Sequence, residues 1–455
     1  MSSGSNDADT APWADLPPDL CNVVVDHLDV VGVIRFPAVC TDWAAASNNT
    51  HCPRLPSGTP TLLTSSLDPE GYDIEYDVEP GTFGLHDVVT GKSYHGEAEG
   101  LKKRTWIGGK DDWLVTTDLR CNVELLNPIT GARVRLPSFA TIPDIQVMEV
   151  HDRGPGVSFE KTLHRFRKVG SYSLSWTPTH RFHKVALCRT PAHPSGYLAV
   201  ALFFSSSGND TGLVAFTAAH DERWTPLNNP PPELHSRDKY TDVIVHKGKV
   251  LAVATSGKIC SWDMDDDTTV EPKILPPPDI DIDVDYYVKR VFYLATSSGG
   301  DLQLICMFGD SKDIKETRWW RIVFDFQWCF WPRRVLLHEL NAVTDTWRRV
   351  GDLGGDRALF VGNNYPFYID VPRDGSKDPF LQADCVYVAD LMNCDAGIFD
   401  LKLGDDFEFE FNWNAHLCYP TLRDPLQIPM WFQPTTALPK STSAHSVEER
   451  QTLLL

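Results

Sequence analysis

The feature that most constrains this chain is a hairpin pattern that recurs along most of its length. In each copy an apolar strand runs into a polar turn, and a strand with bulky or basic residues follows. Repetition of one pattern is the sequence signature of an architecture built from repeated structural units. Five copies and a weaker sixth lie at residues 83–96, 123–137, 213–227, 259–272, 336–350 and 397–410.

Short strand-like stretches surround these hairpins. They are rich in Val, Leu, Phe, Tyr and Trp, and they are separated by Gly, Asp, Asn and Pro, as strands and tight turns require. Within residues 241–263 three of them follow one another, so each hairpin is predicted to be the outer half of a four-stranded sheet. The predicted strands are 84–89, 112–117, 122–127, 197–204, 213–218, 242–247, 249–255, 258–263, 292–297, 302–308, 320–326, 335–340, 358–362, 385–390 and 397–401.

Four short strands per repeat are typical of a β-propeller. A propeller blade usually takes about 40–45 residues. An all-β body over residues 61–435 is therefore predicted to hold about six to seven kelch-like blades of four strands each. A pair of β-sandwiches is the alternative, which the repeated turn disfavours.

The front of the chain follows a different pattern. Across residues 16–47 apolar side chains recur at helical spacing, beginning with Leu20, Val23, Val24 and Leu28. Two prolines at the start suit a first helical turn, because their missing N–H groups would be unpaired there in any case. Pro37 cannot donate to a helix ladder, and it therefore limits a second short helix before a third. This block is predicted to be a small all-α module of three helices.

Local composition completes the domain plan. The first residues are small, polar and acidic, which favours disorder. A stretch rich in turn formers follows the helical block and indicates a linker. The predicted order is a disordered tail (1–11), the helical module (12–47), the linker (48–60), the propeller (61–435) and a second disordered tail (436–455).

The charge of the chain argues against several classes of partner. The net charge is −20, with 62 acidic against 42 basic residues. Nucleic acid and anionic membranes both attract positive charge, so neither is expected to be a partner. The longest apolar run, at 197–204, is far shorter than the ~20 residues that cross a bilayer. The protein is therefore expected to be soluble.

Cysteine usage and motifs bear on compartment and chemistry. The 11 cysteines form no Cys-x-x-Cys pair and no zinc-like spacing, and the first residues lack a signal-peptide pattern. Free thiols are typical of reducing compartments, so a cytoplasmic and/or nuclear location is expected.

The motifs Gly-x-Ser-x-Gly and His-Glu-x-x-His and the phosphate-binding loop are missing from the sequence. We therefore predict a non-enzymatic protein with no catalytic residue, cofactor or metal site.

The helical block resembles the F-box, a three-helix module. The resemblance rests on the Leu16–Pro17 start, on an acidic residue before Leu20, on Leu28 at the end of the first helix, and on the closing stretch RFPAVCTDW at 35–43. Three residues depart from the family's usual pattern: Cys21, Gly32 and Pro37.

The body resembles the F-box-associated propeller family that is abundant in plants and is often called the KIB type. The resemblance covers nearly all residues between 12 and 435. The stretches that carry it occur in the family's order at 111–138, 241–253, 352–364, 383–390 and 429–435.

This resemblance implies a role in ubiquitin conjugation through protein binding. In F-box proteins the module binds a Skp-type adaptor, which joins a cullin–RING (SCF) ubiquitin ligase, and the propeller would bind the target protein. Three short helices cannot bury all their apolar residues among themselves, so a partner is expected to cover the remainder. The residues expected to contact the adaptor or to form the core of the module are Leu16, Pro17, Leu20, Val24, Leu28, Ile34, Val39 and Trp43.

Two other functions stay open at the level of sequence. An F-box protein with a propeller can act as a scaffold or inhibitor outside a ligase, through protein binding alone. Some propellers are hydrolases with a metal in the central channel, although no set of histidines or carboxylates marks such a site in this sequence. Neither the target protein nor the loops that would bind it can be identified from the sequence.

Overall fold

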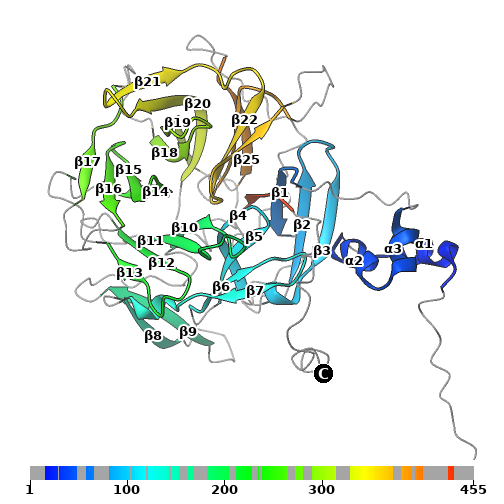
Figure 1. The fold of residues 1–455 in the computed structure, drawn as a ribbon. Helices are drawn as coiled ribbons and strands as arrows, with labels where there is room; N and C mark the ends of the chain where they lie inside the picture. Colours follow the sequence, from blue (N-terminus) through cyan, green and yellow to red (C-terminus); the bar gives the residue numbers. More distant parts are fainter. Residues whose placement is uncertain are drawn as a thin grey trace, which may run out of the picture.

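The computed structural model shows three α-helices beside a ring of six four-stranded β-sheets (Figure 1). The predicted fold class, a small helical module followed by a β-propeller, is therefore confirmed, with six blades. The structure describes residues 16–28, 30–48, 58–65, 81–102, 104–118, 121–142, 145–152, 161–168, 182–203, 212–227, 234, 238–264, 272–279, 289–313, 328–371, 381–390, 395–402 and 429–434.

The three helices form the N-terminal module. Pro17 is the N-cap of the first helix, and its carbonyl accepts hydrogen bonds from the N–H groups of Leu20 and Cys21 at 2.9 and 3.0 Å. Pro37 lies in a short 3-10 helix, which separates the second helix from the third as its missing N–H predicts. The helices are α1 (Pro18–Asp26), α2 (Val30–Arg35), η2 (Phe36–Ala38) and α3 (Thr41–Asn48). Within the described ranges, none of the helices has both the length and the hydrophobicity to cross a membrane.

The first three blades each contain four antiparallel strands. The first blade consists of β26 (Met430–Phe432), β1 (Thr61–Ser65), β2 (Thr82–Asp87) and β3 (Ser93–Glu97). The second consists of β4 (Arg104–Lys110), β5 (Trp113–Asp118), β6 (Val123–Leu126) and β7 (Arg133–Arg135). The third consists of β10 (Phe182–Arg189), β11 (Leu198–Phe203), β12 (Leu213–Ala218) and β13 (Thr225–Pro226).

The remaining blades complete the ring. The fourth consists of β14 (Tyr240–His246), β15 (Lys249–Ala254), β16 (Ile259–Asp263) and β17 (Lys273–Leu275). The fifth consists of β18 (Lys289–Thr296), β19 (Leu302–Asp313), β20 (Trp328–Asn341) and β21 (Thr346–Val350). The sixth consists of β23 (Phe367–Asp370), β22 (Arg357–Gly362), β24 (Cys385–Asp390) and β25 (Asp395–Asp400), and in it β22 runs parallel to β24.

Within the described ranges, four further short elements lie outside the blades. A separate two-stranded sheet follows the second blade in the chain. Two further 3-10 helices occur in connections. These elements are β8 (Ile145–Asp152), β9 (Lys161–Lys168), η4 (Glu99–Leu101) and η5 (Phe139–Thr141).

The strand predictions agree with this architecture. Each predicted strand within the described ranges overlaps an observed strand, whereas the one at 320–326 lies outside them. The five clear hairpin copies supply the third strand of the first five blades and lead into the fourth, as predicted. The second half of the weaker copy, 403–410, lies outside the described residues.

Three of the recurring hairpins share one turn chemistry. Asn127 Oδ1 accepts the N–H groups of Ile129 and Thr130 at 3.0 and 2.9 Å, and Asp87 and Asn341 accept the equivalent pairs in the first and fifth blades. Such short polar side chains stabilise a turn by bonding to the backbone two residues on. The last turn residue in each case has a positive φ: Gly91 (67°), Gly131 (76°) and Asp345 (51°).

The turn of the second blade is expected to be more sensitive to mutation than the turn of the fifth. Asn127 is 3% exposed and also donates from Nδ2 to Asp112 at 2.8 Å, so Asn127→Ala should lower the free energy of unfolding by about 1–2 kcal/mol. Asn341→Ala removes the same turn bonds at an exposed site and should cost about 0.5 kcal/mol. Urea denaturation of both variants tests this order, and equal losses would contradict it.

The C-terminal strand closes the ring of blades. β26 pairs with β1, with Phe432 opposite Thr61. The buried Thr61 hydroxyl also donates to the carbonyl of Phe432 at 2.9 Å. Since the last described strand completes the first blade, the two ends of the propeller hold each other in place.

Neighbouring blades are also joined near the centre of the ring. Lys184 Nζ lies 2.7 Å from Asp242 Oδ1, and Asp242 Oδ2 accepts the N–H of Leu294 at 2.8 Å, which links the third, fourth and fifth blades. The backbones of the second and third blades also approach each other closely at Gly108. A Cβ built at this glycine would lie only 1.9 Å from the carbonyl oxygen of Val185. These contacts favour a rigid propeller.

Candidate functional site

Large apolar side chains that are exposed to solvent concentrate in the helical module. Of the five such residues in the described ranges, Leu20 (51%), Val23 (52%), Leu28 (36%) and Val39 (58%) belong to the module. The fifth, Val343, lies in the turn between β20 and β21. Single exposed apolar residues are normal on a soluble protein. Four of them in one short module make this module the candidate binding site. We call these four the exposed apolar residues.

Helical geometry separates the exposed apolar residues from the core of the module. On α1, Cys21 and Val25 lie one turn apart and are each 1% exposed, whereas Leu20 and Val23 lie toward solvent. The core consists of Cys21, Val25, Phe36 and Ala46, against which Leu16, Val24, Val33 and Trp43 pack. Because the module already has this core, substitutions at Leu20 or Val23 should leave it folded.

The eight residues predicted for adaptor binding fall into three groups. Four are exposed: Pro17, Leu20, Leu28 and Val39. Three pack against the core of the module: Leu16, Val24 and Trp43, the last stacked on Phe36 with ring centroids 4.4 Å apart. Ile34 packs against the core of the propeller. The contact of each residue with an adaptor stays a prediction.

The second helix lies against the propeller. Figure 1 shows α2 nearest to β3, with α3 and α1 farther from the blades. Val31 is 3% exposed and belongs to the apolar core that the first and second blades share. Arg35 Nε donates to the carbonyl oxygen of Ile129 at 2.9 Å. The helical module is therefore joined to the turn between β6 and β7.

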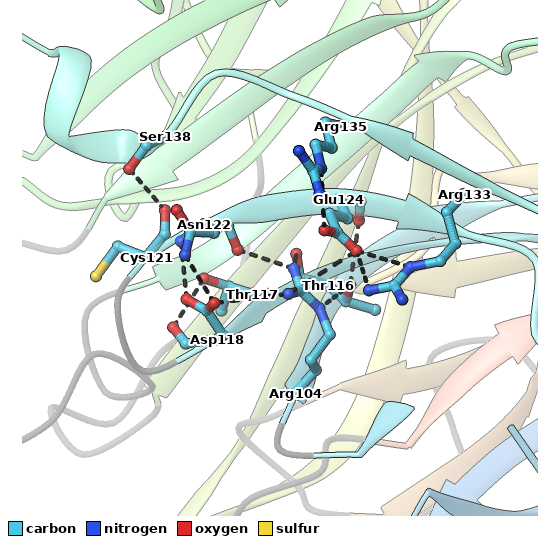
Figure 2. Close-up of polar contacts among 10 residues, drawn as sticks. All are labelled: Arg104, Thr116, Thr117, Asp118, Cys121, Asn122, Glu124, Arg133, Arg135 and Ser138. Carbon is cyan, nitrogen blue, oxygen red and sulfur yellow. Dashed lines mark hydrogen bonds and ion pairs between the residues drawn. The ribbon is translucent and has the colours of Figure 1, made fainter. Parts of the chain in front are cut away.

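A dense polar cluster lies in the second blade (Figure 2). Arg104 is 8% exposed, and it donates to Thr116 Oγ1 and to the carbonyl of Asn122, each at 2.9 Å. Its Nη1 lies 3.7 Å from Asp118 and 3.9 Å from Glu124. Burial lowers the pKa of Arg104, although the two carboxylates oppose this shift. The contacts connect β4 to β5 and to the loop that follows it, so this cluster stabilises the blade.

Four of the seven thiols in the described residues are poorly suited to nucleophilic chemistry. Burial raises the pKa values of Cys188 and Cys385 to about 12, and it raises those of Cys121 and Cys306 as well. A reactive cysteine needs a lowered pKa instead. In the part of the chain that the structure describes, no group of three or more His, Cys, Asp or Glu side chains could hold a metal ion. The exposed apolar residues remain the best-supported candidate site. Their side chains carry no reactive group, so this site can bind a partner but cannot itself make or break bonds.

Three residues that matter at these surfaces were not predicted as site residues. The spacing of Val23 from Leu20 places it in the apolar stripe of the first helix. Because Val23 belongs to a run of three valines, this spacing does not show which of the three faces solvent. The bond of Arg35 to Ile129 joins residues 94 positions apart, and Val31 packs in a core built from the blades, so no local pattern reports either contact.

Curated proteins resemble this chain, one of them over most of its length. F-box only protein 7 of Arabidopsis thaliana is 19% identical over 405 residues, which cover 86% of this chain and 89% of that protein. A second F-box protein of the same plant is 24% identical over 127 residues, which cover 28% of this chain and 33% of that protein. The structure titled "YCF48 bound to D1 peptide" covers 65% of this chain and 82% of its own at 10% identity, with a TM-score of 0.25 that is too low to bear on the fold.

The family comparison concerns the blades themselves. The model of the KIB1-4 beta-propeller family matches residues 83–400, which is well over half of the chain. This range runs from β2 to β25 and includes the five clear hairpin repeats from which the propeller was predicted. The chain belongs to the KIB1-4 beta-propeller family.

Proposed function

We propose that this protein is the substrate-recognition subunit of an SCF ubiquitin ligase. In this proposal the helical module is an F-box that binds a Skp-type adaptor, and the propeller binds the target protein. The observation that carries the proposal is the concentration of exposed apolar residues in the module: Leu20, Val23, Leu28 and Val39. Similarity to F-box only protein 7 over most of both chains supports it.

Covering the exposed apolar residues would be energetically favourable. Complete burial of a leucine or valine side chain contributes about 1.5–3 kcal/mol, and these four side chains are 36 to 58% exposed. A partner with a matching apolar groove would thus gain several kcal/mol before the cost of association. Apolar anchors on short helices are a recurring way to bind a groove in another protein.

The propeller would hold the target in a fixed place. Loops on a rigid scaffold commonly carry binding residues, and the contacts between blades through Asp242 make this scaffold rigid. In this proposal the ubiquitin-transfer chemistry belongs to other subunits of the ligase. The protein itself contributes two binding surfaces.

Affinity purification from plant cells tests the proposal. The full chain is expected to copurify with a Skp-type adaptor, a cullin and a RING subunit, whereas a variant without residues 1–50 should lose these three and keep propeller-bound proteins. In a reconstituted ligase the full chain should become ubiquitinated in an adaptor-dependent way. If the full chain never copurifies with the adaptor, or if the deleted variant retains its cellular activity, the protein acts as a scaffold or inhibitor outside a ligase.

We also propose that the protein works in the cytoplasm and/or the nucleus. The described cysteines are all free thiols, which supports a reducing compartment: Cys21, Cys40, Cys121, Cys188, Cys260, Cys306 and Cys385. A fluorescent fusion of the full chain, followed by cell fractionation, tests this location. Recovery from the secretory pathway would contradict it.

A further inference from the structure

The short helix α2 contacts two different bodies with two different faces. Val33 packs into the core of the helical module. Val31, Ile34 and Arg35 contact the propeller instead. Residues three and four positions apart lie on one face of a helix, so these three residues form a continuous strip along α2. The exposed apolar residues lie on α1 and in the segments that flank α2, outside this strip.

The surface that receives α2 is well ordered by its own contacts. Ile129 is fully buried, and its carbonyl oxygen accepts the hydrogen bond from Arg35. Asn127 fixes the position of this carbonyl, because its side chain bonds to the N–H groups of the same turn. A Cβ built at Gly131 would lie 3.1 Å from Arg35 Nη2, so the guanidinium approaches the backbone of the turn closely. A planar, always-charged arginine suits a fixed carbonyl of this kind.

We infer that Val31, Ile34 and Arg35 form a positioning surface, which fixes the direction of the exposed apolar residues relative to the propeller. Ile34 is then a positioning residue and not an adaptor contact. The consequence for ubiquitin transfer rests on the proposed function: a rigid link between the adaptor and the target keeps the target at a constant place, which raises the effective concentration of its lysines at the transfer site.

Two matched valine variants separate this surface from the adaptor surface. Val31→Asp places a carboxylate at a site that is 3% exposed, and Val23→Asp places one in the same module at a site that is 52% exposed. Hydrogen exchange of residues 126–131 reports on the α2 contact, and calorimetry with a purified Skp-type adaptor reports on binding. Val31→Asp should raise the exchange rates about tenfold and leave the adaptor affinity within about threefold of wild type. Val23→Asp should leave the exchange rates of this segment unchanged and weaken adaptor binding.

Arg35→Gln provides a milder variant in case Val31→Asp fails to fold. It should raise the exchange rates of residues 126–131 by a smaller factor than Val31→Asp does. Circular dichroism should show that the module is still helical. In the reconstituted ligase, mass spectrometry should find ubiquitin on a wider set of lysines of this chain in both α2 variants than in wild type.

The outcomes distinguish the inference from the proposed function. Unchanged exchange at residues 126–131 in both α2 variants would overturn the positioning surface, and so would a loss of adaptor binding in Val31→Asp as large as in Val23→Asp. If Val31→Asp raises exchange while no variant, wild type included, binds the adaptor, the positioning surface stands and the proposed function fails.

Discussion

Replacing Leu20 and Val23 together by aspartate is expected to weaken binding of a Skp-type adaptor by at least about a thousandfold. Each residue is about half exposed in the free protein and would become an apolar anchor in the complex. Truncation of such an anchor typically costs about 2 kcal/mol or more, and every 1.4 kcal/mol is about a tenfold change in affinity. A carboxylate in an apolar groove adds the cost of burying an unpaired charge. Calorimetry with purified adaptor measures the loss.

The chain supplies its own control for this experiment. Val343→Asp changes the most exposed large apolar residue of the described ranges, at 93%, but on the propeller. Adaptor affinity should stay within about twofold of wild type in this variant, because surface changes away from an interface usually have small effects. Circular dichroism should show the module folded in the double variant, since its core residues Cys21 and Val25 are untouched. Adaptor binding that survives the double change would remove the proposed binding surface.

The experiment is cleaner at these positions than at the first two residues of the F-box pattern. Leu16 packs against the core of the module, so its removal would weaken folding and binding together. The carbonyl of Pro17 accepts the first hydrogen bonds of α1, which makes Pro17 part of the helix start as well. The sequence could not separate a role in the core of the module from a role in adaptor binding. A helical stripe shows which residues are apolar, but not which of them pack inside the module.

The blades could be predicted from the sequence because the information that forms them is local. A hairpin such as β6–β7 needs alternating apolar residues, an asparagine at the start of the turn and a glycine at its end, all within 123–137. The same logic located the outer hairpins of the first five blades. The three consecutive strands within 241–263 indicated four strands per sheet. Repetition then indicated a ring of such sheets, since one blade cannot bury its faces without its neighbours.

Features that depend on distant residues were not predictable. The pairing of β26 with β1 joins residues more than 360 positions apart, and three residues of strand carry little pattern of their own. The parallel pairing of β22 with β24 in the sixth blade follows from the path of the chain and not from its residue types. The role of Ile34 likewise depends on a surface to which the second blade contributes. The apolar spacing of α2 was therefore equally compatible with contact to an adaptor and with contact to the propeller.

Asp242→Ala is expected to lower the free energy of unfolding of the propeller by about 3–5 kcal/mol. The Lys184–Asp242 pair is almost completely buried, with 3% and 1% of the side chains exposed and 2.7 Å between Nζ and Oδ1. Removing the carboxylate would leave the lysine charge in an apolar interior without its partner, and the N–H of Leu294 would lose its acceptor too. Urea denaturation of the purified protein measures the loss.

Two comparisons make this prediction specific to burial and position. Lys184→Met should cost less than Asp242→Ala, because Asp242 still accepts the N–H of Leu294 and methionine fills the space of the lysine stem. Arg348→Ala breaks an ion pair with Glu339 that is 3.0 Å long but largely exposed on the arginine side, and it should cost less than about 1 kcal/mol. If Asp242→Ala costs no more than Arg348→Ala, the junction of the third, fourth and fifth blades does not depend on the buried charge, and the rigidity of the propeller must come from its apolar packing alone.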